Sequence, residues 1–265
     1  MTGEGLRARL RRGDRLVGTT LSMPGAAFAE LAAAPWDLVW VDLEHGALGI
    51  GELRDVVVGV TAAGSSALAR IPADDTGRIT PALDCGVAGI VVPNLESAEQ
   101  ARDVVRRLRY PPDGDRGYGR RRVATADRHR AAGDPQADRP LCLVQIETVA
   151  GVRDCAAIAA VDGVDGIVVG TADLSFALGT PLDVTSPEMI DALRRVHDAA
   201  AASGTPFGLA GGFAPGTLDP ELEAAARLLV IGTDLALCAA AFDASAARWR
   251  AAAPDGQGDT PWPRT

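Results

Sequence analysis

The chain has 265 residues, of which 47% are hydrophobic and 23% are charged, and this is enough to bury one large core. Its formal net charge of −9 argues against nucleic acid as a partner. No apolar run approaches the roughly 18 residues of a membrane span, and the amino terminus is not basic and then apolar, so neither a membrane partner nor secretion is predicted.

Eight short apolar runs have the composition of buried β-strands. In chain order they cover residues 15–23, 38–42, 67–71, 89–93, 141–148, 166–170, 205–210 and 228–232. Helical patterns lie between most of these runs. They begin after Pro24 and then cover residues 51–63, 74–83, 97–108, 149–160, 187–202 and 235–252. Ser97 is a favoured N-cap residue, and Pro187 occupies the favoured first helical position.

Eight strand-then-helix units without a domain break predict an α/β protein with a single (β/α)8 TIM barrel over residues 1–253. Residues 254–265 are expected to form a disordered tail. A doubly wound open sheet is the alternative, but no glycine fingerprint follows the first strand.

The one long irregular segment covers residues 110–140 and is rich in Arg, Gly, Asp and Pro. Its run Arg120–Arg122 is typical of a solvated surface loop. The same guanidinium groups could instead meet an anionic substrate or cross to a neighbouring subunit.

Basic residues are all of one type, because the 26 Lys and Arg residues are all arginine. Schiff-base chemistry and pyridoxal-phosphate attachment both need a lysine amine, so side-chain imine catalysis is excluded. A phosphate loop ending in Gly-Lys-Ser/Thr is excluded as well. The four cysteines are scattered without paired spacing, which predicts reduced thiols and a cytoplasmic protein.

Polar side chains gather where the predicted strands end. Because the loops after the strands build the top face of such a barrel, these residues are candidates for a site. They are Asp42, Glu44, His45, Arg70, Asn94, Gln145, Glu147, Asp173 and Asp234.

Two carboxylates in this set, Glu147 and Asp173, end the fifth and sixth strands. Their hard oxygen atoms suit Mg²⁺ or Mn²⁺, with water or substrate completing the coordination. The alternative is that both are rim carboxylates paired with arginines. Strand alternation points Gln145 to the same face as Glu147, where it could bind a ligand or pack inside the barrel.

His45 is the only histidine that directly follows a strand, and carboxylates at Asp42 and Glu44 precede it. This arrangement suits a general base near neutral pH, although a rim histidine can also be structural. Arg70 ends the third strand among apolar neighbours, where a guanidinium needs a carboxylate, phosphate or enolate partner.

Several segments together resemble the HpcH/HpaI aldolase family, the metal-dependent pyruvate aldolases of the phosphoenolpyruvate/pyruvate barrel superfamily. The resemblance extends from about residue 15 to residue 250. The segments are residues 36–46 (WDLVWVDLEHG), 68–70 (LAR), 83–86 (LDCG), 91–93 (VVP), 110–117 (YPPDGDRG), 144–147 (VQIE) and 164–175 (VDGIVVGTADLS).

The resemblance implies a role for each matching residue. Glu147 and Asp173 match metal ligands for Mg²⁺ or Mn²⁺, or also Co²⁺, and Arg70 matches the arginine that stabilises the enolate. His45 matches the acid/base histidine. The remaining matches are Asp42 and Asp84, acidic residues thought to assist the histidine, Gln145 in the pyruvate pocket, and Ala172 with Asp173 in the turn that holds the pyruvate carboxylate.

The implied reaction is the reversible cleavage of a 4-hydroxy-2-oxo acid to pyruvate and an aldehyde through a metal-stabilised enolate. The family also implies a homo-oligomer, a hexamer of swapped dimers in which the last helix, 235–252, packs on a neighbouring subunit. Two departures from the family are Thr171, where a proline is usual, and the arginines 120–122. The second departure favours an anionic or highly polar acceptor.

Three other readings share parts of this pattern. One is an oxaloacetate decarboxylase that forms carbon–carbon bonds, of the macrophomate synthase type. Another is an acyl-CoA lyase of the citrate lyase β type, with the arginine-rich loop on a CoA phosphate. The third is a barrel that binds a keto acid without turnover.

Overall fold

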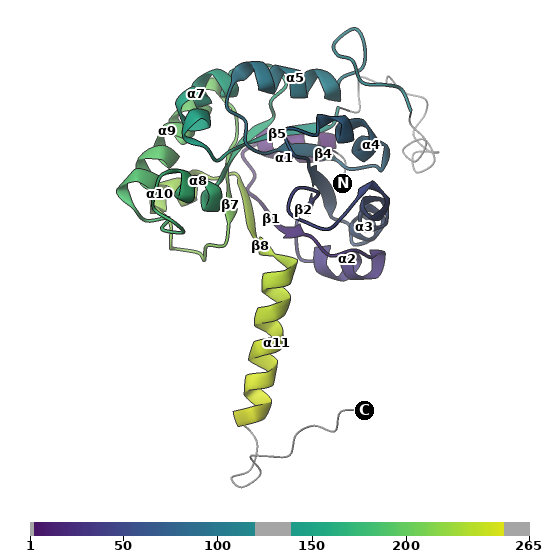
Figure 1. The fold of residues 1–265 in the computed structure, drawn as a ribbon, viewed down its shortest axis with the longest axis vertical. Coiled ribbons are helices and arrows are strands. Elements are labelled where there is room, and N and C mark those ends of the chain that lie inside the picture. The colour runs from purple at the N-terminus through teal and green to yellow at the C-terminus, as the bar shows by residue number, and fades with distance from the viewer. Residues whose placement is uncertain (1–2, 120–138, 252–265) are drawn as a thin grey trace.

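The computed structural model describes residues 3–119 and 139–251. Eight parallel strands pair in sequence order and close into a barrel, and helices surround it (Figure 1). This confirms the predicted (β/α)8 fold. The strands are β1 (Leu16–Leu21), β2 (Leu38–Asp42), β3 (Ser66–Arg70), β4 (Gly89–Val92), β5 (Leu141–Ile146), β6 (Gly166–Gly170), β7 (Phe207–Gly211) and β8 (Leu228–Thr233).

One helix precedes the first strand, and at least one helix follows each strand. They are α1 (Gly3–Arg11), α2 (Ala26–Ala33), α3 (Ile50–Ala62), the 3₁₀ turn η1 (Thr76–Arg78) with α4 (Ile79–Asp84), α5 (Ala98–Leu108), α7 (Val149–Ala159), α8 (Thr171–Ala177), α9 (Pro187–Ser203), α10 (Pro220–Ala225) and α11 (Asp234–Ala251). Ser97 and Ser186 accept backbone N–H bonds as N-caps, and Pro187 is the first residue of α9.

Most strand residues are buried because the helices cover the outside of the barrel and apolar side chains fill its inside. The inner cluster contains alternate strand residues such as Trp40, Leu68 and Leu143. The outer cluster joins the strands to the helices. Register places the last residues of β2 and β3, Asp42 and Arg70, side by side at the carboxyl ends of the strands.

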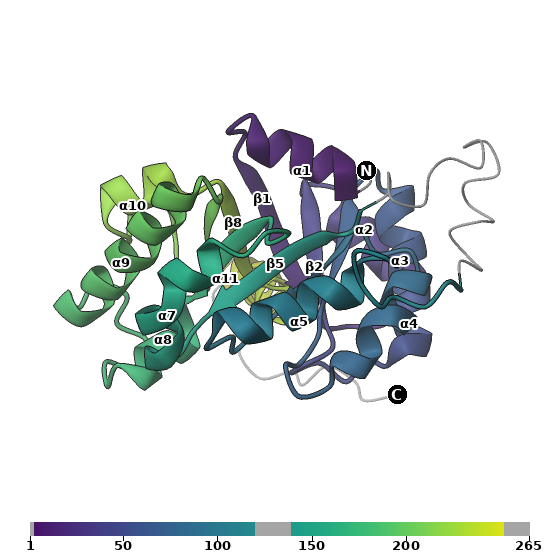
Figure 2. The same ribbon diagram turned by 90° about the horizontal axis from the view of Figure 1, so that it is seen from above.

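Helix α1 is an element that the sequence reasoning missed. It lies over the amino-terminal ends of the strands (Figure 2), and its Leu6 and Leu10 belong to the inner core cluster. Two leucines among arginines give too short a pattern to predict this closure. The six-residue helix α10 was also missed, although Asp219 caps it and Pro220 opens it.

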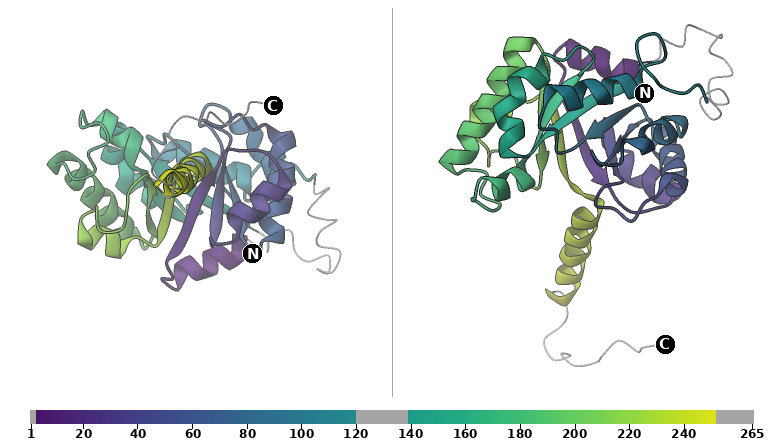
Figure 3. Two further views of the ribbon diagram at one scale, coloured as in Figure 1. Left: turned by 90° about the horizontal axis from the view of Figure 1, so that it is seen from below. Right: turned by 45° about the horizontal axis from the view of Figure 1, so that its top comes forward.

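Helix α11 projects away from the barrel (Figures 1 and 3). Among its side chains, Leu235, Phe242 and Trp249 are 58%, 71% and 79% exposed. Across the part of the chain that the structure describes, no helix is both long enough and apolar enough to span a bilayer. The predicted tail 254–265 lies outside the described residues.

Candidate functional site

The base of the site is an ion pair between neighbouring strand ends. Arg70 donates from Nε to Asp42 Oδ1 at 3.0 Å and from Nη2 to Asp42 Oδ2 at 2.6 Å. Burial alone would raise the pKa of Asp42, but the bonds and charge of Arg70 outweigh it and hold that pKa below its ordinary value. The guanidinium is therefore locked in one orientation at the mouth of the barrel.

Asp42 also orders the turn that carries the histidine. Its Oδ1 accepts the backbone N–H groups of Glu44 at 3.0 Å and His45 at 3.2 Å. The family resemblance assigned Asp42 to assist His45. In the structure its carboxylate binds Arg70 and contacts His45 through the backbone N–H, and its assistance to the histidine stays a prediction.

Glu44 is the carboxylate that faces the His45 ring. Glu44 Oε2 lies 3.6 Å from His45 Nε2 and 3.4 Å from Arg70 Nε, and it has no hydrogen-bond partner among the described residues. Burial raises the pKa of Glu44. The His45 side chain is 66% exposed and is thus open to a substrate.

The fourth strand contributes through Asn94, which directly follows Pro93 and has a φ of 55°. Asparagine tolerates this left-handed conformation better than most residues. The turn aims its backbone N–H at Glu147 Oε1, at 3.0 Å, and its side-chain amide at Glu44 Oε1, at 3.4 Å. One residue therefore links the two carboxylates.

Glu147 lies at the centre of the site and is only 2% exposed. Its Oε2 accepts a short hydrogen bond from Gln145 Nε2, as the strand alternation predicted for neighbours on one face. Burial, followed by the charges of Asp173 and Glu44, raises the pKa of Glu147 to about 7. A buried carboxylate beside other carboxylates calls for a cation.

Asp173 lies in the first turn of α8, immediately after β6. The negative charge of Asp173 contributes to the raised pKa values of both Glu147 and Glu44. Ala172 and Asp173 are exposed at this helix start. Thr171 is buried, and its hydroxyl donates to the carbonyl of Ala210 at 3.1 Å, tying α8 to β7.

The residues present fit a hard divalent cation. A Cβ added to Gly170 would overlap Glu147 Oε2 and Gln145 Nε2, so glycine keeps the space beside the carboxylate open. Gln145 Oε1 is a further buried oxygen without a hydrogen-bond partner among the described residues. Within residues 3–119 and 139–251 no group of three or more His, Cys, Asp or Glu could hold a metal by itself. Mg²⁺ commonly takes only one or two carboxylates, so Glu147 and Asp173 suffice.

Two other candidates lie apart from this centre. Asp234 accepts bonds from the backbone N–H and hydroxyl of Ser22 and from Met23 N–H, so it joins the end of β1 to α11. Asp84 ends α4 and faces Gly119, where an added Cβ would lie 3.1 Å from its Oδ2. Its assistance to His45 stays a prediction. The arginines 120–122 lie outside the described residues.

The raised pKa of Glu147 predicts a pH-dependent affinity for metal. Because a metal ligand must be deprotonated, we expect the affinity for Mn²⁺ to fall about tenfold per pH unit below pH 7. Isothermal titration calorimetry at pH 5.5, 6.5 and 7.5 measures this, and a constant affinity would contradict it. The same pKa predicts that stability contributed by this group in the metal-free protein is present below pH 4.5 and is lost as the pH rises through about 7.

Comparison with known proteins gives a consistent family. A sequence model described as HpcH/HpaI aldolase/citrate lyase matches residues 22–241. A hydroxypyruvate/pyruvate aldolase of Roseobacter denitrificans is 34% identical over 254 residues, covering 91% of this chain and 95% of that enzyme. A 4-hydroxy-2-oxovalerate aldolase of Rhodococcus jostii is 35% identical over 257 residues, covering 91% and 93%. The crystal structure of an HpcH/HpaI aldolase/citrate lyase family protein from Burkholderia cenocepacia has a TM-score of 0.85 and 29% identity, covering 93% of this chain and 99% of that one.

Proposed function

The chain belongs to the HpcH/HpaI aldolase/citrate lyase family and is a carbon–carbon lyase, and we propose that it reversibly cleaves a 4-hydroxy-2-oxo acid to pyruvate and an aldehyde with the help of a divalent metal. The observation that supports this most is the meeting of Glu147, Asp173 and Arg70 at one end of the barrel. A chain without lysine needs such an electrostatic site to stabilise an enolate.

Glu147 and Asp173 would hold the cation, for which Mg²⁺ and Mn²⁺ are the first candidates and Co²⁺ the third. When bound, the cation supplies Lewis-acid polarisation of the 2-oxo acid. Gln145 lines the same space and is assigned to the keto acid. The backbone N–H groups of Ala172 and Asp173, at the start of α8, are assigned to its carboxylate.

Arg70 is assigned to the developing enolate. Its fork is already oriented by Asp42, so no rotamer has to be ordered when the negative charge forms. His45 takes the proton of the 4-hydroxyl group as the C3–C4 bond breaks. Glu44 faces the imidazole Nε2, with its Oε2 at 3.6 Å.

Replacing His45 with alanine is expected to lower kcat by about 10²–10⁴-fold, because general acid–base catalysis contributes about this much. The KM for the oxo acid should change little, since the proposed binding groups are elsewhere. Steady-state kinetics of pyruvate release measures both values. The matched control is His197→Ala, a histidine on α9 remote from the site, and equal activity of both variants would remove His45 from the mechanism.

A turnover panel tests the function itself. Pyruvate is incubated with aldehydes of different size and charge, and the cleavage of 4-hydroxy-2-oxovalerate is followed in reverse. Aldol product formation supports the proposal. Release of CO₂ from oxaloacetate without aldehyde would favour the decarboxylase, dependence on CoA would favour the acyl-CoA lyase, and binding without turnover would favour the non-catalytic barrel. The polar acceptor suggested by residues 120–122 stays a prediction.

We further propose that the enzyme is a homo-oligomer in which α11 packs on another subunit. The helix leaves the barrel and exposes Leu235, Leu237, Phe242 and Trp249, and burying such side chains is the usual driving force of association. A hexamer follows from the family resemblance. The cytoplasmic location expected from the cysteines also stays a prediction.

Phe242→Glu combined with Trp249→Glu is expected to reduce the mass of the particle in solution. Both side chains are more than 70% exposed in the single subunit, so a charge on each would disrupt a contact between subunits. Light scattering coupled to size-exclusion chromatography measures this mass. The neighbouring Asp243→Asn should leave it unchanged. An unaltered mass in the double variant would show that α11 does not join subunits.

A further inference from the structure

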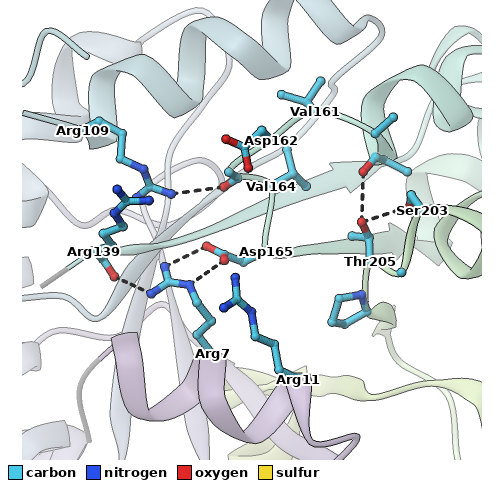
Figure 4. Close-up of a pocket in the computed structure, with 15 residues that line it drawn as sticks. Arg7, Arg11, Arg109, Arg139, Val161, Asp162, Val164, Asp165, Ser203 and Thr205 are labelled. Carbon is cyan, nitrogen blue, oxygen red and sulfur yellow. Dashed lines mark hydrogen bonds and ion pairs between the residues drawn. The ribbon is translucent and has the colours of Figure 1, made fainter. Parts of the chain in front are cut away.

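An open cavity of about 440 Å³ lies at the end of the barrel opposite to the candidate active site. Its walls include the residues that directly precede β5, β6 and β7, together with one side of α1. Figure 4 shows guanidinium groups reaching into it from two directions. The charged lining residues are Arg7, Arg11, Arg109, Arg139, Asp162 and Asp165.

The lining is cationic in a chain whose net charge is −9. Arg7 and Asp165 form a buried bidentate pair, with Nε to Oδ1 at 2.6 Å and Nη2 to Oδ2 at 2.9 Å. Arg7 also donates to the carbonyls of Arg139 and Pro140 at 3.1 Å and 2.9 Å. This pair is satisfied internally. Of the other three arginines, Arg139 pairs with the exposed Asp113 outside the lining at 3.5 Å, and Arg11 and Arg109 form no ion pair within the described residues.

Arg109 is the least compensated of these three. It is 6% exposed, and its guanidinium donates only to the carbonyls of Pro140 at 3.4 Å and Gly163 at 3.5 Å. Both distances exceed the roughly 2.7–2.9 Å of a strong charge-assisted bond. No carboxylate within the described residues forms an ion pair with it. Burial lowers the pKa of Arg109, although the charge of Asp165, a carboxylate that Arg7 already binds, raises it in part.

Arg11 completes the arrangement from α1. Its side chain is exposed and forms no hydrogen bond or ion pair with the described part of the chain. In Figure 4 it extends from the helix into the space beside the Arg7–Asp165 pair. It can therefore turn its fork to a ligand without breaking an existing contact.

The carboxyl ends of α7 and α9 border the same cavity and place partial negative charge there. Carbonyl groups at these helix ends accept hydrogen bonds from nearby hydroxyl groups and not from the arginines of the lining. Thr205 Oγ1 donates to Ala159 O at 3.0 Å, and Ser203 Oγ donates to Ala200 O at 3.0 Å. At about half a charge each, the two helix ends and the exposed Asp113 reduce the positive charge of the lining without pairing with Arg11 or Arg109.

We propose that this cavity binds a phosphate-type oxyanion, either inorganic phosphate or the phosphoryl group of a small phosphorylated metabolite. Planar guanidinium forks match the oxygen pairs of a phosphate, and Arg11 and Arg109 are lining residues that have no carboxylate partner within the described residues. The bound anion would join α1 to the segments before β5 and β6. The site is independent of the aldolase reaction proposed above.

Calorimetric titration with sodium phosphate and with glycerol 3-phosphate tests this, at constant ionic strength set with chloride and with a chelator present. Arg11→Gln and Arg109→Gln are each expected to weaken binding by about tenfold, the effect of losing one charge-assisted bond. Arg12→Gln is the matched control, because Arg12 pairs with Asp14 at 2.9 Å and does not line the cavity. Glu147→Gln should bind the anion like the wild type, which separates this site from the catalytic one.

The two probes distinguish the sources of the anion. Binding of phosphate alone identifies the free ion, and tighter binding of glycerol 3-phosphate identifies a phosphorylated metabolite. Should Arg109→Gln fail to fold, Arg11→Glu decides in its place, since Arg11 is exposed. The proposal is overturned if neither probe binds the wild type, or if the Arg11 variants bind as tightly as Arg12→Gln.

Discussion

Glu147→Gln is expected to lower kcat by at least about 10³-fold and to abolish measurable Mn²⁺ binding. Glutamine has the same shape, and its oxygen can still accept the Asn94 N–H that bonds to Glu147 at 3.0 Å. Its amide can donate to Gln145 Oε1, which has no partner within the described residues, once the Gln145 amide turns over. Glutamine cannot supply the negative charge that a metal needs. The loss should therefore come from charge and not from a rearranged site.

Stability separates this effect from misfolding. Because burial and neighbouring carboxylates raise the pKa of Glu147 to about 7, its charged form is costly in the metal-free protein above that pH. The glutamine variant should thus be at least as stable as the wild type at pH 8, measured by urea unfolding in chelator. Glu99→Gln, on the exposed first turn of α5, is the control for both readouts. A variant that keeps wild-type kcat would mean that Glu147 holds no metal.

Arg70→Ala is expected to reduce both stability and turnover. Truncation leaves Asp42 buried without its partner, and breaking such a buried pair typically costs about 3–5 kcal/mol of unfolding free energy. Loss of the proposed enolate contact should lower kcat by about 10²–10³-fold. Arg70→Lys should also lose activity, because an ammonium group cannot reproduce the two-pronged contact with Asp42.

A double variant distinguishes the two roles of Arg70. Asp42→Asn removes the stranded charge, so Arg70→Ala combined with Asp42→Asn should regain part of the stability but none of the activity. Arg106→Ala serves as the control, since its pairs with Asp103 and Asp115 are exposed and are each worth about 0–1 kcal/mol. Activity that returns together with stability would reduce Arg70 to a structural residue.

Much of the barrel could be predicted because its strands are short apolar runs with helical patterns between most of them. Parallel strands bring their carboxyl ends to one edge, so residues as distant as Asp42, Arg70 and Glu147 could be grouped without a structure. The absence of lysine then excluded catalysis through a side-chain imine, and the reaction through an enolate came from the family resemblance.

The contacts within that group were less accessible to prediction. Asp42 and Glu44 are two residues apart, yet Asp42 forms the close ion pair with Arg70 while Glu44 faces His45. Which carboxylate meets which cation depends on strand register and on the turn after β2, and neither is visible in residue order. Asp234 also follows a strand, but its carboxylate accepts hydrogen bonds from the backbone N–H groups of Ser22 and Leu235, so its role is structural.

Helix α1 escaped prediction for a different reason. Its two buried leucines pack into the inner core of the barrel. This packing depends on the tertiary structure and is not visible in a short sequence pattern. The contacts of Arg7 and Arg109 could not be predicted for the same reason, because both residues bind groups on distant segments of the chain.

The central claim is that a divalent cation between Glu147 and Asp173 is required for turnover. The most direct measurement is pyruvate release from 4-hydroxy-2-oxovalerate, by enzyme first depleted with a chelator and then supplied with Mg²⁺ or Mn²⁺. We predict no turnover after depletion and its return with either ion, in the wild type but not in Glu147→Gln. Full activity in excess chelator would contradict the account.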